Sequence, residues 1–158
     1  MYDLKKFYLL IVLILFLPTK SLGLIEVDIT RGNLNPLPLA VSPLSIDEDS
    51  RISFEKLLKK KNIGSEISII VENNLKTSGL FNPLDKNAFL QEPDIANLKP
   101  RFEDWNLIKA QALITGKVNF VDEKLRVEFR LWDVLAGKEM MALAFTTVPN
   151  NWRRVGHI

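Results

Sequence analysis

The densest group of reactive side chains in the sequence is the acidic run Asp47-Glu48-Asp49. Carboxylates serve acid–base catalysis or bind a metal ion when they converge in a partly dry pocket that separates their pKa values. Consecutive residues in a polar segment point in different directions, so these three acids do not converge by themselves. The run therefore predicts a solvated surface rather than a catalytic or metal site.

Other residue types that do chemistry are scarce. The only histidine is His157, and the absence of cysteine excludes a disulfide, a thiolate metal site and a lipid-modified cysteine. No Ser-His-Asp set, metal-ligand spacing or glycine-rich phosphate loop occurs. We therefore expect a protein that is not an enzyme and that needs no metal or cofactor. A small hydrolase is the alternative that a deep pocket with converging carboxylates would favour.

The charge balance argues against nucleic acid as a partner. The chain has 21 basic and 19 acidic residues, and removal of the first 23 residues takes away three lysines and one aspartate, which leaves 18 of each sign. Binding to a phosphate backbone is driven by an excess of basic side chains, which this balance does not provide. The run Lys59-Lys60-Lys61 is the one local exception, and it predicts a solvated face.

The first 23 residues predict a cleaved secretory signal. Lys5 and Lys6 precede the apolar run 7–17, and the small residues Ser21 and Gly23 occupy the positions that signal peptidases recognise. The apolar run is about half of the roughly 20 residues that a transmembrane helix needs. We therefore expect residues 1–23 to be removed during secretion. A membrane-tethered accessory protein is the alternative if this segment stays uncut.

Alternating strands and a charged segment follow. LIEVDIT, residues 24–30, alternates between apolar and polar residues, which is typical of a half-buried strand. A second, short strand is expected at residues 39–41, where neighbouring prolines limit its length. Residues 45–62 are mostly charged and predict an exposed insertion containing a short helix. The apolar stripe of that helix consists of Phe54, Leu57 and Leu58.

A longer helix is predicted over NIGSEISIIVENNLKT, residues 62–77, because apolar residues recur there at helical spacing. Gly79 follows its last turn, where chains commonly enter the left-handed conformation that glycine adopts without strain. One of the two apolar residues after Gly79 is expected to contact that turn, and Pro83 prevents the helix from continuing. Asp85 is expected to accept hydrogen bonds from nearby backbone amides in a turn.

A linker rich in proline and asparagine comes next, and Pro100 is expected in the first turn of a short helix. The aromatic residues of that helix, Phe102 and Trp105, predict core packing. Between residues 111 and 145 the period becomes two, and turns divide the segment into three strands. We therefore expect an α+β fold: a mixed sheet with a C-terminal three-stranded antiparallel meander and helices packed on one face. A last helix from Trp152 is expected to be truncated, because it has under two turns.

The sequence resembles the amino-terminal domain family of TolB, a component of the Tol-Pal system. The most characteristic segment is SGLFNPLD, residues 78–85, followed by Ala88-Phe89. Further pieces occur in the same order: LIEVDIT, PLPLAVSPL, PRFEDWNLIKAQALITGKV, RVEFRLWDVLAGKEM and NWRRVGHI. Together they cover nearly all of residues 24–158. The central residues that carry the resemblance are Gly79, Phe81, Asn82, Pro83 and Asp85.

The resemblance implies a small α/β domain followed by a six-bladed β-propeller. This sequence lacks the propeller, and the stretch between Leu44 and Ile63 is longer than the family usually has. We therefore expect residues 24–158 to form the amino-terminal domain alone. In the family the propeller is the main surface for the lipoprotein Pal, so Pal is expected as a partner only if a propeller follows.

The resemblance also implies a periplasmic, non-catalytic protein that supports envelope integrity and cell division. The carboxy-terminal domain of TolA, an inner-membrane protein, binds the mature N-terminal segment of such proteins. An alternating terminal strand can add to a sheet edge, where backbone hydrogen bonds supply affinity and alternate side chains supply specificity. No nucleic acid or small molecule is expected as a ligand. The residues expected to contact a TolA-like partner are Ile25, Glu26, Val27, Asp28, Ile29, Thr30 and Arg31.

Overall fold

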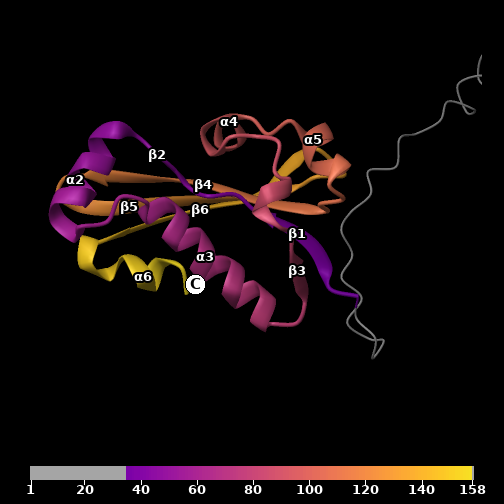
Figure 1. Cartoon of the computed structure of the whole chain (residues 1–158), viewed down its shortest axis with the longest axis horizontal. Coiled ribbons are helices and arrows are strands. Elements are labelled where there is room, and N and C mark those ends of the chain that lie inside the picture. Colours follow the sequence, from indigo (N-terminus) through magenta and orange to yellow (C-terminus); the bar gives the residue numbers. More distant parts are fainter. Residues whose placement is uncertain (1–34, 158) are drawn as a thin grey trace, which may run out of the picture.

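The computed structural model describes residues 35–157. The predicted signal segment 1–23 and the predicted strand at residues 25–30 lie outside the described residues, as does Ile158. In the described part, one sheet runs through the middle of the molecule and helices pack against it (Figure 1).

Among residues 35–157 the sheet contains six strands, of which five follow the order β3-β1-β4-β5-β6, and β2 is a further neighbour of β4. The strands are β1 (Leu37–Val41), β2 (Ser45–Ile46), β3 (Phe81–Pro83), β4 (Ala112–Val121), β5 (Lys124–Asp133) and β6 (Lys138–Thr147). The helices are α2 (Glu48–Leu58), α3 (Ile63–Thr77), α4 (Pro93–Leu98), α5 (Phe102–Leu107) and α6 (Trp152–Val155), with short 3-10 helices η1 (Lys86–Ala88) and η2 (Pro149–Asn151).

Both parallel and antiparallel pairs occur in the sheet. β1 pairs in parallel with β3 on one side and with β4 on the other, and β2 pairs in parallel with a later part of β4. Pro43 lies between β1 and β2, where it cannot donate a ladder hydrogen bond, so the chain leaves the sheet and rejoins it. β4, β5 and β6 pair antiparallel in sequence order. The predicted meander is therefore confirmed.

Alternation along the meander places most of its large apolar side chains on one face. Ile114 lies opposite Leu131, and Phe129 lies opposite Leu143. The helices α2, α3 and α6 cover this face, and their apolar stripes complete the main core. The predicted α+β fold is confirmed: the sheet is mixed, and the helices of the main core pack on one face. The buried residues of this core are Leu44, Phe54, Ile63, Ile67, Ile70, Val118, Leu125, Val127, Trp152 and Val155.

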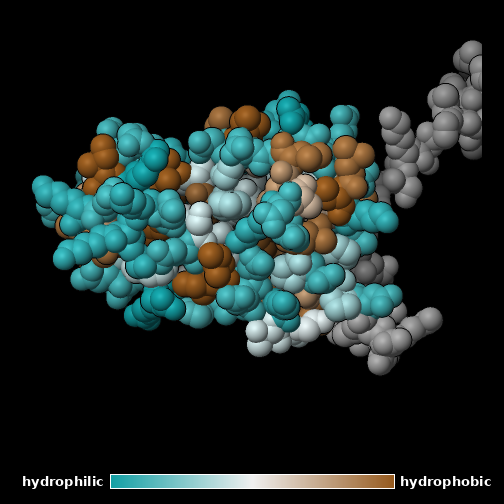
Figure 2. Space-filling model, viewed as in Figure 1, coloured by the Kyte–Doolittle hydropathy of each residue, from teal (hydrophilic) through white to brown (hydrophobic). Residues whose placement is uncertain are grey.

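A smaller cluster lies on the opposite face at one end of the sheet, because Ala40 and its neighbour Leu113 point away from the main core. Ala96 of α4 and Trp105 of α5 pack against them. Trp105 is 1% exposed, so this aromatic residue belongs to a core as predicted. Figure 2 shows hydrophobic side chains at the surface over α4 and α5, where Leu98 and Leu107 are the most exposed.

Residues 45–62 contain the short helix that the sequence predicts, but the expected full exposure was wrong for part of the segment. The segment supplies β2 and all of α2, and Phe54 is completely buried with its ring 5.4 Å from that of Phe120. Leu57 of the expected apolar stripe is 55% exposed, whereas Phe54 of the same stripe is completely buried. The strand that buries it, β4, comes much later in the chain.

Other differences lie between residues 81 and 107. Phe81–Pro83 form a strand rather than part of a turn, and the expected linker contains η1 and α4. Pro100 precedes the N-cap of α5, Arg101, instead of lying in the first turn. These elements have six residues or fewer, and helices of that length depend on tertiary packing more than on local preference. Their hydrophobic pattern is correspondingly weak.

Candidate functional site

The acidic run at residues 47–49 begins a helix. The Oδ1 atom of Asp47, the N-cap of α2, accepts a 2.9 Å hydrogen bond from the backbone amide of Ser50. This hydrogen bond lowers the pKa of Asp47 below its usual value, and Lys117, whose Nζ lies 3.8 Å away, acts in the same direction. A carboxylate held ionised at a helix N-terminus stabilises that helix rather than serving as a general acid.

His157 also has a local structural contact. The Nδ2 atom of Asn74 in α3 lies 2.8 Å from the carbonyl oxygen of Gly156 and 3.2 Å from Nδ1 of His157. Among residues 35–157, no group of three or more histidines and carboxylates is placed to hold a metal ion. No helix in the same range has the length and apolar character to cross a membrane.

An apolar groove of about 320 Å³ lies between α3, α6 and the outer half of the meander. Its lining contains no carboxylate, so it does not provide the converging acids that a hydrolase would need. The residues that line it are Val71, Asn74, Leu75, Ile114, Phe129, Arg130, Leu131, Met141, Leu143, Phe145, Val155 and Gly156.

The 77–85 segment, which carries the central motif residues, leads from α3 into the edge of the sheet. Ser78 caps α3, and Gly79 adopts a φ of 73° with open space where a Cβ would stand. This left-handed residue turns the chain back toward β1. The carbonyl oxygen of Leu80 then accepts a 2.9 Å hydrogen bond from the amide of Leu37, the first residue of β1.

Pairing continues along β3. Phe81 lies opposite Leu37, Asn82 opposite Pro38, and Pro83 opposite Leu39. Phe81 packs against the apolar cluster under the last turns of α3, as predicted for one of the two residues after Gly79. Because β3 is an edge strand of the described sheet, Pro83 can lie in it without breaking a ladder on its free side.

Asp85 and Lys86 fix the end of the segment. Oδ1 of Asp85 accepts a 2.9 Å hydrogen bond from the amide of Asn87 and caps η1. Nζ of Lys86 lies 2.8 Å from a carboxylate oxygen of Glu72 in α3, and both side chains are half-buried. The segment is therefore held at both ends by α3 and along its middle by β1.

The expected partner-binding residues 25–31 lie outside the described residues, so their contacts are not observed. The described chain begins at Asn35, immediately before β1. The motif segment 77–85 therefore holds the strand into which residues 25–34 lead. Both segments are recognisable in the sequence, but no local pattern indicates that they are connected through β1.

A buried glutamine was missed. Oε1 of Gln91 accepts hydrogen bonds from Nε1 of Trp105 at 2.9 Å and from the amide of Arg101 at 3.2 Å, while its Nε2 lies 3.2 Å from Oδ2 of Asp104. Gln91 is 6% exposed. It holds α5 against the rest of the chain, and nothing in the proline-rich sequence around it indicates this role.

The sequence profile of the TolB amino-terminal domain matches residues 25–140. The chain belongs to the TolB amino-terminal domain family. The matched region begins at the alternating segment and extends into β6, so it includes the motif segment 77–85 and most of the meander.

A curated relative of this chain is also named as a TolB protein. The Tol-Pal system protein TolB of Pelagibacter ubique (strain HTCC1062) is 80% identical over 149 residues, which are 94% of this chain and 33% of that protein. The chain thus spans about a third of the length of this curated relative.

Two solved structures show the same fold. TolB from Acinetobacter baumannii superimposes with a TM-score of 0.58 at 19% identity, over 77% of this chain and 26% of that one. The LpoB C-terminal domain from Salmonella enterica reaches a TM-score of 0.50 at 11% identity, over 74% of this chain and 86% of that one. At these identities the likeness concerns the fold alone.

Proposed function

We propose that the chain is a non-catalytic interaction domain of the Tol-Pal system that works in the periplasm. Its residues 25–31 bind the carboxy-terminal domain of a TolA-like inner-membrane protein, and this contact serves envelope integrity and cell division. The observation that carries the proposal is the 80% identity to a protein named as the TolB of the Tol-Pal system. Binding of a Pal-like lipoprotein is assigned to a propeller rather than to the residues of this chain.

The fold supports a role for the N-terminal segment. β1 is anchored on both sides, by β3 and by β4, and begins two residues after Asn35. A segment that joins such a strand can pair with a partner's sheet edge while the domain stays folded. In that mode the backbone supplies hydrogen bonds, and alternate side chains enter pockets of the partner. The apolar set is Ile25, Val27 and Ile29.

Titration calorimetry with a purified TolA carboxy-terminal domain tests the interface. Deletion of residues 24–31 is expected to abolish binding and to leave the melting temperature nearly unchanged. Val27→Asp should weaken binding strongly, because it places a charge in the apolar set. Leu107→Asp makes the same chemical change at a side chain that is 74% exposed, and it should leave the affinity unchanged. If the variant without residues 24–31 bound the TolA carboxy-terminal domain with the same affinity as the chain that keeps them, the proposed interface would be refuted.

The proposed location has its own test. Cleavage after Gly23 would give a periplasmic protein that begins at Leu24, and mass spectrometry of a periplasmic extract measures this directly. Detection of only the uncut chain in the membrane fraction would contradict the periplasmic assignment and support a tethered protein.

A further inference from the structure

Basic side chains from two distant parts of the sequence meet at the end of the molecule formed by α2 and α6. The loop after α2 contributes Lys59, Lys60 and Lys61, and α6 contributes Arg153. Nζ of Lys60 and the guanidinium carbon of Arg153 lie 5.1 Å and 5.3 Å from the centre of the Trp152 ring. Figure 1 shows α2 and α6 as neighbours at this end, away from the start of β1.

Buried side chains and a hydrogen bond hold the short helix α6, which carries Arg153, against the domain. Trp152 and Val155 are buried in the main core, and the carbonyl oxygen of Gly156 accepts a 2.8 Å hydrogen bond from Asn74. The ring of Trp152 attracts both cations, so Lys60 and Arg153 are both held near this side chain. This arrangement cannot be inferred from the lysine run alone.

Only part of this positive charge is neutralised within the domain. Lys60 pairs with Glu66 at 2.6 Å, and Lys61 pairs with Glu55 at 3.4 Å. Among residues 35–157, no carboxylate oxygen lies within 4.0 Å of a charged nitrogen of Lys56, Lys59 or Arg153. These three side chains are exposed, so their charges are available to an anionic partner.

An apolar hollow of about 600 Å³ lies beside α2 and η2. Lys56 belongs to its rim, and two of its apolar side chains, Leu57 and Val148, are more than half exposed. Phe120 and Pro149 complete the apolar lining. A concave surface of this kind receives a side chain from a partner. A membrane-binding surface would instead present apolar side chains that insert into the lipid boundary.

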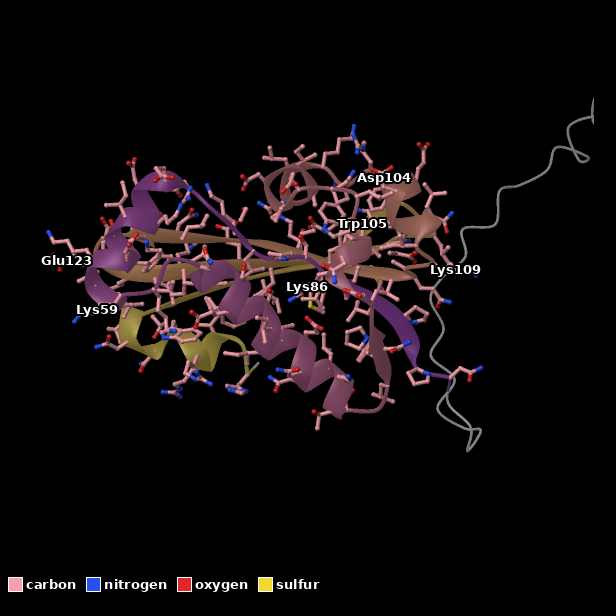
Figure 3. The ribbon with its side chains drawn as sticks, viewed as in Figure 1. Lys59, Lys86, Asp104, Trp105, Lys109 and Glu123 are labelled. Carbon is pink, nitrogen blue, oxygen red and sulfur yellow. The ribbon has the colours of Figure 1, made fainter. Side chains whose placement is uncertain are left out.

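Glu123 places a negative charge on one side of the hollow. It lies on the rim contributed by the turn between β4 and β5, and Figure 3 shows it at the same end of the molecule as Lys59. Carboxylates of a ligand would be repelled by Glu123 and attracted by Lys56, which also lines the hollow. The charge pattern therefore favours a ligand with an apolar group in the hollow and acidic groups near Lys56.

We propose that the α2–α6 end, defined by Lys56, Leu57, Lys59, Phe120, Val148 and Arg153, binds an acidic segment of a partner protein. An apolar side chain of that segment fills the hollow, and neighbouring carboxylates contact Lys56, Lys59 and Arg153. This surface lies apart from the start of β1, so it provides a second contact beyond the proposed TolA-like one.

Fluorescence anisotropy of the full chain with a labelled peptide of glutamates interrupted by leucines tests the proposal. The double variant Lys56→Gln, Arg153→Gln is expected to bind about tenfold more weakly, as the loss of two exposed ion pairs implies. Its matched control, Lys99→Gln with Lys138→Gln, removes the same number of charges from exposed positions outside the α2–α6 end and should keep the original affinity. Equal affinity of the two double variants would overturn the proposal.

The apolar part of the site has a separate readout. Leu57→Asn should weaken the peptide while leaving the slope of affinity against salt concentration unchanged, because it removes no charge. A peptide with lysine in place of glutamate should not bind. If the chain bound phosphatidylglycerol vesicles but not the acidic peptide, the surface would be a lipid site, and the proposal of an acidic protein partner would be overturned.

Discussion

The amide of Leu37 donates a 2.9 Å hydrogen bond to the carbonyl oxygen of Leu80, and this contact joins the first described strand to the motif segment 77–85. Gly79 makes the contact possible by turning the chain after α3. The family motif therefore has a structural purpose in this chain. It fixes the strand that follows the proposed partner-binding residues.

Replacement of Gly79 tests this turn. Gly79→Val is expected to lower the free energy of unfolding by about 1 kcal/mol or more, because a β-branched residue is strained at a φ of 73°. The space around the position is open, so the cost is conformational rather than steric. Gly79→Asn should cost less, since asparagine tolerates this conformation. Urea unfolding measures both, and equal stability of the valine variant and the natural chain would contradict the assignment.

The burial of Phe54 can also be tested by its effect on stability. Phe54→Ala should cost about 3–5 kcal/mol, because it empties a fully buried site against Phe120. Leu57→Ala lies on the same helix at a side chain that is 55% exposed, and it should change the stability by less than about 0.5 kcal/mol. If both changes lowered the free energy of unfolding by a similarly small amount, the burial of Phe54 would be contradicted and residues 45–62 would be an exposed insertion.

The buried glutamine provides a third test. Gln91→Met keeps most of the side-chain volume but leaves the ring N–H of Trp105 and the amide of Arg101 without their acceptor. We expect a loss of about 2 kcal/mol in the free energy of unfolding. Gln111→Met is the matched control, since the side chain of Gln111 makes no hydrogen bond to any other described residue. A loss as large at Gln111 would show that the glutamine network is not responsible.

The pKa of Asp47 predicts how stability depends on pH. This pKa lies below its ordinary value of 3.8 in the folded chain, chiefly because the Ser50 amide donates to the carboxylate. The stabilisation is therefore complete above 3.8 and is lost as the pH falls through the lowered value. Asp47→Ala should cost about 1 kcal/mol at neutral pH, as expected for a lost N-cap.

The gap in unfolding free energy between the Asp47→Ala chain and the natural chain should narrow as acid is added. Urea unfolding at a series of pH values measures it. Asp49→Ala, two residues further on, removes a carboxylate that does not cap the helix, so it should give a smaller gap at neutral pH. If the difference in unfolding free energy between Asp47→Ala and the natural chain stayed constant well below pH 3.8, the capping role would be contradicted.

Strong periodic patterns predicted the main elements correctly. The long helix α3 and the three strands of the meander each carry enough apolar residues at a regular spacing for the hydrophobic effect to select one structure locally. Asp85 as a local cap followed from short-range hydrogen bonding. The short elements β3 and α4 did not follow, because so few residues give no clear period.

The sequence by itself determined the α+β fold, the turn at Gly79 and the scarcity of catalytic groups, since these depend on side-chain type and local spacing. Only the tertiary structure decided that Phe54 is buried against β4, that Gln91 joins α5 to its surroundings, and that Lys60 and Arg153 both lie near the ring of Trp152. Each of these relationships needs two segments that are distant in the chain. Their proximity results from packing around the common sheet, which no local pattern encodes.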